Sequence, residues 1–555
     1  MKIDLPSEKH VHHLTLLRQP RAITTAEFNA LSFEERLHII SSQESKEKYQ
    51  LICAAKDGTR IVTKLAPQDL LLLFKDLGLR EVSDILDMVT PEQFTNFIDF
   101  DCWDGDRLNA VNVLEWLEAL LEGAEADKAF ALLKGMDPAL LTLVVKNLLA
   151  VLEEREEDNE GKEEEEEEEE EGQTKSEAFK TAEATLKLIQ NQDPQTFHEL
   201  FLVAVSECES SLEEEVYRFQ QGRLQDQGFP EYWEARKIYL YLDPDRLALN
   251  RTEKKSSGYP LETTPPGFVA RINDNEVDSE FPASEGPQEL MWEMAFLVNK
   301  VLVADGLSSG DSEQIREVLA EVKDYLHIGR LFTLERREAN PEANLKGLGL
   351  ETLFRVGFSL TLRLGKRSQA LGETTIRPFL DGPFREFLKC LELPKPRFYI
   401  GMENICSSGN RRFTTLDDIR KAEQWLAKIE TQQRLFENHF GFDLSLFALE
   451  PGSGKTEEVV LSDIFLTALA NRLLGRKFYP SPLTTQDIHQ LHNQVSSDGK
   501  LRTELREDTA AWLESMEKGG CEFASFCLEV WEEEFCPLKQ NALDPAYIGG
   551  LLIGS

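Results

Sequence analysis

The chain has 555 residues, of which 41% are hydrophobic, and its 100 acidic and 61 basic residues give a formal net charge of −39. A surface with this excess of negative charge repels phosphate backbones and acidic membranes, which excludes nucleic acid as the main partner. The length is sufficient for roughly two to four domains, each with its own core.

Membrane insertion and secretion are also disfavoured by the sequence. The longest apolar runs, such as 140–152, contain Lys146 and Asn147 and are too short to span a bilayer. Asp4 and Glu8 interrupt the start of the chain, and no apolar signal segment follows them. The eight cysteines are scattered and form no disulfide framework. We therefore expect a cytoplasmic protein.

Residues 1–22 are polar and contain His10, His12 and His13. Three histidines this close together can suggest a metal site. One segment cannot direct all three at a single ion, however, and no cysteine or carboxylate spacing completes a tetrahedral set. We therefore expect a solvated N-terminal arm and no metal.

The first helix signal follows at Thr24. Its hydroxyl can accept a hydrogen bond from the backbone N–H of Glu27, while the Glu27 carboxylate reaches back to the N–H of Thr24. Similar openings recur at 413–417 and 483–488. Each predicts the N-terminus of a helix.

Residues 65–152 repeat one helix start: an apolar residue, a spacer, a proline, two spacers and another apolar residue. Proline suits the first helical position because its φ is already helical and its missing N–H would have had no partner there. Apolar residues then follow at helical spacing on one side, so the helices must stack on each other. The prolines are Pro67, Pro91 and Pro138.

Residues 65–152 resemble the superhelical repeat in the cytosolic N-terminal domain of MgtE-type magnesium transporters and in flagellar motor switch proteins. The resemblance implies an N-terminal superhelical array of helical repeats. It does not imply transport, because this chain has no predicted membrane-spanning segment. It also raises the possibility of a divalent-cation sensor.

The whole chain resembles an uncharacterised bacterial family that is known only as a domain of unknown function. The segments that carry this resemblance are Gly228-Phe229-Pro230 and Asp544-Pro545-Ala546-Tyr547. The resemblance implies membership of a family and supplies no mechanism.

The sharpest change in composition begins at Glu153. From there to Glu171 the chain has fifteen acidic and two basic residues, a net charge of −13. Like charges at helical spacing repel, and no apolar residue is present to dock the segment. We predict an acidic disordered insert over 153–175, or a frayed extension of the preceding helix. The functional alternative is a segment that attracts and binds a basic partner or divalent cations.

The helical array is expected to continue over 176–249. Asp193-Pro194 repeats the capped proline start. The apolar residues that share one face after it are Phe197, Leu200, Phe201, Ala204 and Val205. The aromatic residues of the next helix start, 228–233, are predicted to lie in the core, with a peptide-binding groove as the alternative.

Residues 250–287 are rich in proline, glycine, serine, threonine and charge, which predicts a linker. It would connect an N-terminal helical array, over 1–152 and 176–249, to a larger α-helical domain over 288–555. The only strand predicted there is 397–400. The predicted helices are 290–303, 315–326, 350–364, 383–391, 416–436, 461–474, 485–495, 508–516 and 521–535. The sequence therefore predicts an all-α protein.

Two segments resemble ligand sites and are predicted not to be. Residues 452–456 read Gly-Ser-Gly-Lys-Thr, but a phosphate-binding loop needs a glycine where Leu449 stands, and it should follow a buried strand. Asp487, His489 and His492 share one predicted helix, but they lack a further ligand. We therefore expect no nucleotide, metal or cofactor at either segment.

The remaining cysteines of interest are Cys521, Cys527 and Cys536. Their spacings of six and nine residues are wider than the tight pairs of a zinc site. Buried free thiols are the expected state.

A basic stretch, Lys346–Arg377, stands out from the acidic background. It contains six basic and two acidic residues, a net charge of +4. It could bind an anion, an acidic partner or the chain's own glutamate-rich run, and the alternative is an ordinary solvated helix end. The candidate binding residues are Arg355, Arg363, Lys366, Arg367 and Arg377.

No nucleophile with a recognisable base is present in the sequence, so the catalytic residues, if any, are unknown. We expect a non-catalytic cytoplasmic scaffold or regulatory protein that binds another protein through stacked helices. The alternative is an enzyme, or a sensor of a small ligand or divalent cation, with its site in the C-terminal half.

Overall fold

The computed structural model describes residues 2–4, 8–11, 14–17, 22–161, 169–246, 263–270, 287–339, 348–404, 407–447, 459–538 and 548–554. Within these ranges the chain is built of helices, and its strands form only short pairs. This confirms the prediction of an all-α protein.

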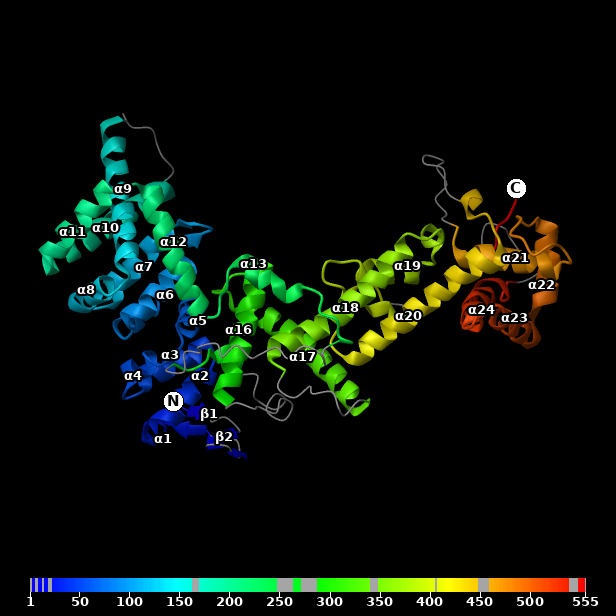
Figure 1. The fold of residues 1–555 in the computed structure, drawn as a ribbon, viewed down its shortest axis with the longest axis horizontal. Helices are drawn as coiled ribbons and strands as arrows, with labels where there is room; N and C mark the ends of the chain where they lie inside the picture. The colour runs from blue at the N-terminus through cyan, green and yellow to red at the C-terminus, as the bar shows by residue number, and fades with distance from the viewer. Residues whose placement is uncertain are drawn as a thin grey trace. The chain divides into compact units, whose positions relative to one another are not determined.

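Twenty-three α-helices lie in the described residues, and Figure 1 labels most of them. In chain order they are α1 (Thr25–Ala30), α2 (Phe33–Ser42), α3 (Ser45–Ala54), α4 (Gly58–Val62), α5 (Pro67–Leu77), α6 (Pro91–Asp101), α7 (Ala110–Gly123), α8 (Ala126–Lys134), α9 (Pro138–Gly161), α10 (Glu169–Gln192), α11 (Pro194–Ser206), α12 (Glu209–Asp226), α13 (Tyr232–Ala235), α14 (Gly267–Ala270), α16 (Pro287–Asp305), α17 (Ser312–Ala339), α18 (Leu350–Gly372), α19 (Gly382–Leu391), α20 (Leu416–Arg434), α21 (Leu461–Leu473), α22 (Thr485–Val495), α23 (Thr503–Met516) and α24 (Gly520–Val530).

The described strands form five antiparallel pairs. These are β1 (Lys2–Asp4) with β4 (Ala22–Thr24), β2 (Glu8–Val11) with β3 (Leu14–Leu17), β5 (Trp103–Asp104) with β6 (Arg107–Leu108), β7 (Phe398–Tyr399) with β8 (Asn410–Arg411), and β9 (Ser496–Ser497) with β10 (Lys500–Leu501). The strand predicted at 397–400 is therefore present as β7. The strand pairs of the N-terminal arm, in which β1 pairs with β4 and β2 with β3, were not predicted.

The predicted helix starts are confirmed. Pro67, Pro91, Pro138 and Pro194 are the first residues of α5, α6, α9 and α11. Thr90 caps α6 in a reciprocal arrangement: its hydroxyl accepts from the backbone N–H of Gln93, and the Gln93 side chain accepts from the N–H of Thr90.

The three threonine openings also begin helices. Thr24 caps α1 with Glu27, and Thr484 caps α22 with Asp487. At the opening over 413–417 the capping residue is Thr415, with Asp418 as its partner. These side chains satisfy backbone donors that have no partner inside the helix.

The chain divides into two compact units, which we describe separately. The first comprises Met1–Leu240, Arg251–Lys323 and Lys346–Thr352, and the second comprises Tyr241–Asn250, Asp324–Leu345 and Leu353–Ser555. This division differs from the predicted linker at 250–287. The reason is that α14 and α16 pack with the N-terminal helices: Gln68 of α5 and Asn299 of α16 exchange two side-chain hydrogen bonds.

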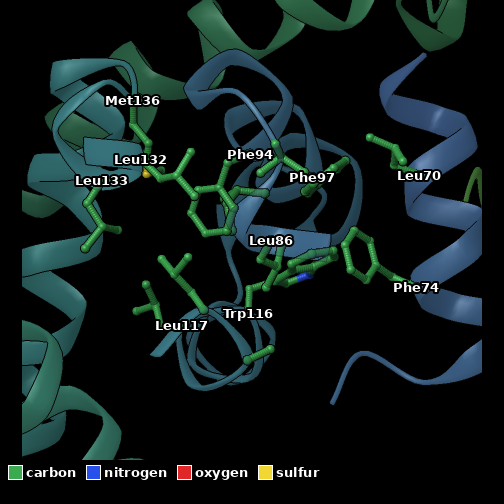
Figure 2. Packing of buried hydrophobic residues seen from close by; sticks show 14 of the residues in the cluster. Leu70, Phe74, Leu86, Phe94, Phe97, Trp116, Leu117, Leu132, Leu133 and Met136 are labelled. Atoms are coloured by element: carbon green, nitrogen blue, oxygen red, sulfur yellow. The ribbon is translucent and has the colours of Figure 1, made fainter. Parts of the chain in front are cut away.

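An aromatic cluster fills the core of the first unit (Figure 2). The Trp116 ring stacks on Phe97 at 5.1 Å between centroids and meets the edge of Phe74 at 5.2 Å. Its indole N–H donates to Asp101 Oδ2 at 2.8 Å, so the one polar atom of this buried side chain is satisfied. Helices α5, α6 and α7 are thereby joined.

The acidic run is helical at both of its described ends. Helix α9 continues to Gly161 and α10 begins at Glu169, while residues 162–168 lie outside the described residues. The helical extension of α9 corresponds to the second of the two sequence readings. Helices α9, α10 and α11 pack against one another, and Figure 1 shows them side by side.

In the second unit, α17 and α18 cross at two glycines. A Cβ atom on Gly329 would lie 2.0 Å from the carbonyl oxygen of Leu353, and one on Gly357 would lie 2.0 Å from that of Tyr325. Only glycine permits backbones to approach this closely. The unit also holds a large group of aromatic side chains in mutual contact: Phe436, Phe440, Phe442, Phe465, Phe478 and Phe523.

No single helix in the described ranges is both long and apolar enough to cross a membrane. One pair, α8 with the first part of α9 (Pro138–Glu153), passes the test of length and composition only when the two are taken together, and a 117° bend separates them. Leu132, Leu140 and Val145 of this pair are buried in the core of the first unit.

Replacing Trp116 with alanine should destabilise the first unit by about 3–5 kcal/mol, because it removes the largest side chain of the core and leaves a cavity. Urea unfolding followed by far-UV circular dichroism measures this change. Val111→Ala on the same helix is the control, since Val111 is 63% exposed and its truncation should cost less than about 0.5 kcal/mol. Equal effects of the two substitutions would contradict this description of the core.

Candidate functional site

The predicted basic stretch lies largely on α18, and its cations contact groups of the same unit. Arg367 donates from Nη2 and Nε to Glu430 Oε1 of α20 at 2.8 and 3.1 Å. Arg363 lies 3.3 Å from Glu423 Oε1 of α20 and 3.4 Å from Asp245 Oδ2. These two arginines therefore connect α18 to α20.

Two of the other predicted residues also contact side chains of the second unit. Arg377 Nη2 lies 2.8 Å from Glu392 Oε2. The Lys366 ammonium lies 3.9 Å from the centroid of the Tyr241 ring, which is a cation–π distance. Arg355 is half-buried on α18, and the side chain of Lys346 lies outside the described residues. Binding of an anion or partner here stays a prediction, and such a ligand would have to compete with these carboxylates.

The residues of the predicted helix with two histidines serve structural roles. Asp487 accepts from both terminal nitrogens of Arg476, at 2.6 and 3.1 Å, and from the backbone N–H of Thr484 at 3.0 Å. The Arg476 guanidinium and these hydrogen bonds lower the pKa of Asp487. His492 is buried with its ring 5.2 Å from that of Phe535.

Other chemistry-bearing candidates give no site in the described ranges. Residues 452–456 and the side chains of His10, His12 and His13 lie outside them. No group of three or more histidine, cysteine, aspartate or glutamate side chains in those ranges could hold a metal ion. Cys527 and Cys536 are buried free thiols and Cys521 is a half-buried one. Burial raises the pKa of the Cys527 thiol well above its usual range.

Helix α11 presents an apolar surface to solvent. Phe201, Leu202, Val203 and Val205 are all exposed, with Leu202 at 53% and Val205 at 64%. The spacing of Phe201, Leu202 and Val205 places them on one side of the helix. Val203 lies on another side of the helix, so we call Phe201, Leu202 and Val205 the α11 apolar face.

The adjacent side of α11 holds the helix in place. Phe197 and Leu200 pack on the core of the first unit, and Ala204 is 1% exposed. Lys146 of α9 donates from Nζ to the carbonyl oxygens of Ala204 and Glu207, at 2.7 and 2.9 Å. A cation at this end is favourable because the last carbonyls of a helix have no partner within it.

The start of α11 is fixed as well. Asp193 accepts from the backbone N–H of Thr196 at 3.1 Å, and its other oxygen lies 2.8 Å from Lys134 Nζ of α8. These hydrogen bonds lower the pKa of Asp193. Both ends of α11 are therefore anchored to the unit while its apolar face remains open.

The sequence places Phe197, Leu200, Phe201, Ala204 and Val205 on one face of α11. The structure buries only part of that face, because Phe201 and Val205 are exposed. The signal was present, because five consecutive apolar residues, 201–205, exceed what one side of a helix can bury.

The aromatic segment over 228–233 also divides between core and surface. Phe229 is 6% exposed, and its ring lies 5.3 Å from that of Phe100. Trp233 is 73% exposed and meets the ring of Tyr232 at 5.3 Å. The prediction that this segment lies in the core is thus correct for Phe229 and wrong for Trp233.

Comparison with known protein families identifies one match that spans nearly the whole chain. The DUF6178 family, described as a family of unknown function, matches residues 25–554. The chain belongs to the DUF6178 family. No curated protein and no solved structure matches it.

A buried carboxylate lies in the second unit of this DUF6178 member. Asp381 immediately precedes α19 and accepts through Oδ1 from the Ser462 hydroxyl of α21, whereas Oδ2 has no hydrogen-bond partner among the described residues. Burial, with the nearby Asp463 carboxylate adding to it, raises the pKa of Asp381 to about 6. The Cys527 thiol lies in the same buried region.

Asp381→Asn should stabilise this DUF6178 member at neutral pH. With a pKa of about 6 when folded and about 3.9 when unfolded, Asp381 contributes stability in its protonated form below pH 4 and loses it as the pH rises through 6. The variant should therefore gain up to about 3 kcal/mol at pH 7.5 and nothing at pH 4. Guanidinium unfolding at several pH values measures the difference.

The control for this experiment is Asp443→Asn, which changes an exposed carboxylate of the same unit. Its effect on the free energy of unfolding should be small at every pH. If the gain from Asp381→Asn were the same at pH 4 and pH 7.5, the elevated pKa would be refuted.

Proposed function

We propose that this DUF6178 member is a non-catalytic helical scaffold or regulatory protein of the cytoplasm that binds another protein through the α11 apolar face. The observation that carries the proposal is the exposure of three large apolar side chains on one side of a helix whose two ends are anchored. Contiguous apolar surface of this kind is characteristic of protein interaction sites.

The charge around this face favours a particular partner. The α11 apolar face is bordered by the exposed carboxylates Glu199 and Glu207, and the whole chain carries a net charge of −39. A partner segment with apolar side chains flanked by lysine or arginine would bury the apolar surface and approach under electrostatic attraction. An amphipathic basic helix is the simplest such segment.

The sequence resemblance supports the same proposal. Residues 65–152 resemble the helical repeats of the MgtE-type N-terminal domain and of flagellar motor switch proteins, and we propose a superhelical stacking of the N-terminal helices on that basis. Stacked helical repeats offer extended surfaces for protein binding. The free thiols of the described cysteines suit a reducing compartment.

The alternative is an enzyme, or a sensor of a small ligand or divalent cation, with its site in the C-terminal half. It has less support, because Arg363, Arg367 and Arg377 are engaged with carboxylates of their own unit. An anion would have to displace these contacts before it could bind.

Replacing both Leu202 and Val205 with aspartate should abolish partner binding without unfolding the protein, because both side chains are more than half exposed. Tagged wild-type and variant proteins would be used to capture partners from native extract, with quantitative mass spectrometry as the readout. We expect proteins retained by the wild type to fall at least tenfold with the variant, while its circular dichroism and Tm stay unchanged.

Val111→Asp is the control, since it places one such negative charge at a similarly exposed apolar residue on α7. It should retain the wild-type partners. Retention of the same proteins by all three baits would refute a role for α11, and retention of none above the tag alone would count against a protein-binding function.

A further inference from the structure

Residues 263–270 form a short segment that is buried against the first unit. The segment lies between residues 247–262 and 271–286, which are outside the described residues. It reads Thr-Thr-Pro-Pro-Gly-Phe-Val-Ala and ends in the single turn α14. Phe268 and Val269 are only 7% and 2% exposed. An eight-residue segment cannot hold such a conformation by itself, so the surface beneath it must impose it.

The surface under the segment is formed by α2, α3, α5, α16 and the residue Lys64. The backbone N–H of Thr264 donates to the carbonyl oxygen of Lys64 at 2.9 Å. The N–H of Gly267 donates to Asp69 Oδ1 of α5 at 2.9 Å. The segment is thus bound in part through its backbone, as extended peptides commonly are.

The carboxylate that receives the segment is an unusual group for a core. Asp69 Oδ1 also lies 2.7 Å from Lys48 Nζ of α3, and both side chains are 3% exposed. The other oxygen, Asp69 Oδ2, has no hydrogen-bond partner in the part of the chain that the structure describes. A buried charge pair with an unfilled acceptor contributes little to stability compared with apolar packing. It does supply a fixed charged acceptor for a peptide N–H.

The site also restricts the size of the residue at position 267. A Cβ atom on Gly267 would lie 2.1 Å from the carbonyl oxygen of Ser41 in α2, and 3.0 Å from both Asp69 Oδ1 and Lys48 Nζ. Only glycine fits this position without moving backbone atoms. The preceding prolines, Pro265 and Pro266, are buried and restrict the free segment, which lowers the entropic cost of binding.

We propose that the groove formed by α2, α3, α5, α16 and Lys64 is a peptide-binding site for a Pro-Pro-Gly-Phe-Val segment, and that residues 263–269 of this chain are its releasable occupant. Asp69 accepts a hydrogen bond from the glycine N–H, and the Ser41 carbonyl excludes larger residues at that position. The groove buries the phenylalanine and valine side chains. The groove is separate from the α11 apolar face and does not depend on the function proposed for it.

The test uses the full-length chain and a fluorescent peptide with the sequence of residues 263–271. Phe268→Asp weakens the internal occupant and leaves the groove side chains Lys48 and Asp69 in place. In fluorescence anisotropy the Phe268→Asp chain should bind the peptide with a Kd at least tenfold lower than the wild-type chain does. In the wild type the tethered segment competes at high effective concentration. A peptide with alanine in place of glycine should bind at least tenfold more weakly.

Phe219→Asp is the matched control, because it changes a half-exposed phenylalanine of the same unit outside the groove, and it should bind no more peptide than the wild type. The proposal is overturned if a folded Phe268→Asp chain binds no more peptide than this control. It is also overturned if the glycine and alanine peptides bind equally.

A second measurement needs no substitution and covers the case in which Phe268→Asp does not fold. Hydrogen exchange of the wild-type chain, read by mass spectrometry, should show amides of 264–269 exchanging at least tenfold faster than those of α5. They should still exchange more slowly than in the free peptide. Exchange of both segments at one common rate would mean that 263–269 is released only by unfolding, and the proposal would fail.

Discussion

The fold depends on giving hydrogen-bond partners to the first backbone N–H groups of its helices. Each helix leaves such donors at its start, and leaving them unpaired next to a packed core costs free energy. Prolines at the first position of α5, α6, α9 and α11 remove one donor each, and Thr90, Thr415 and Thr484 accept from others. Helices that begin at fixed residues turn fixed sides toward the core, which is how Trp116 meets Phe74 and Phe97.

The helices could be predicted because these signals are local. The predicted bounds 485–495 coincide with α22, and 461–474 extends only one residue past α21. The strand pairs of the N-terminal arm were not predicted, because β1 finds its partner about twenty residues away, in β4. A pairing of that kind leaves little trace in the composition of either segment.

The candidate sites were harder to predict for the same physical reason. The sequence shows the net positive charge of the basic stretch but not its partners. The α20 carboxylates that contact Arg363 and Arg367 lie about sixty residues further along the chain. Sequence spacing on one helix cannot show such partners. The α11 apolar face could have been recognised from the five consecutive apolar residues of that helix, whereas the groove under residues 263–269 depends on four separate helices.

The crossing of α17 and α18 has a consequence for how this chain can change. At Gly329 and Gly357 the opposing carbonyl oxygens occupy the space that even a methyl group would need. Even alanine, the smallest replacement, would force the two backbones apart at either position. Any other residue at Gly329 or Gly357 therefore requires the helix pair as a whole to adopt a wider spacing.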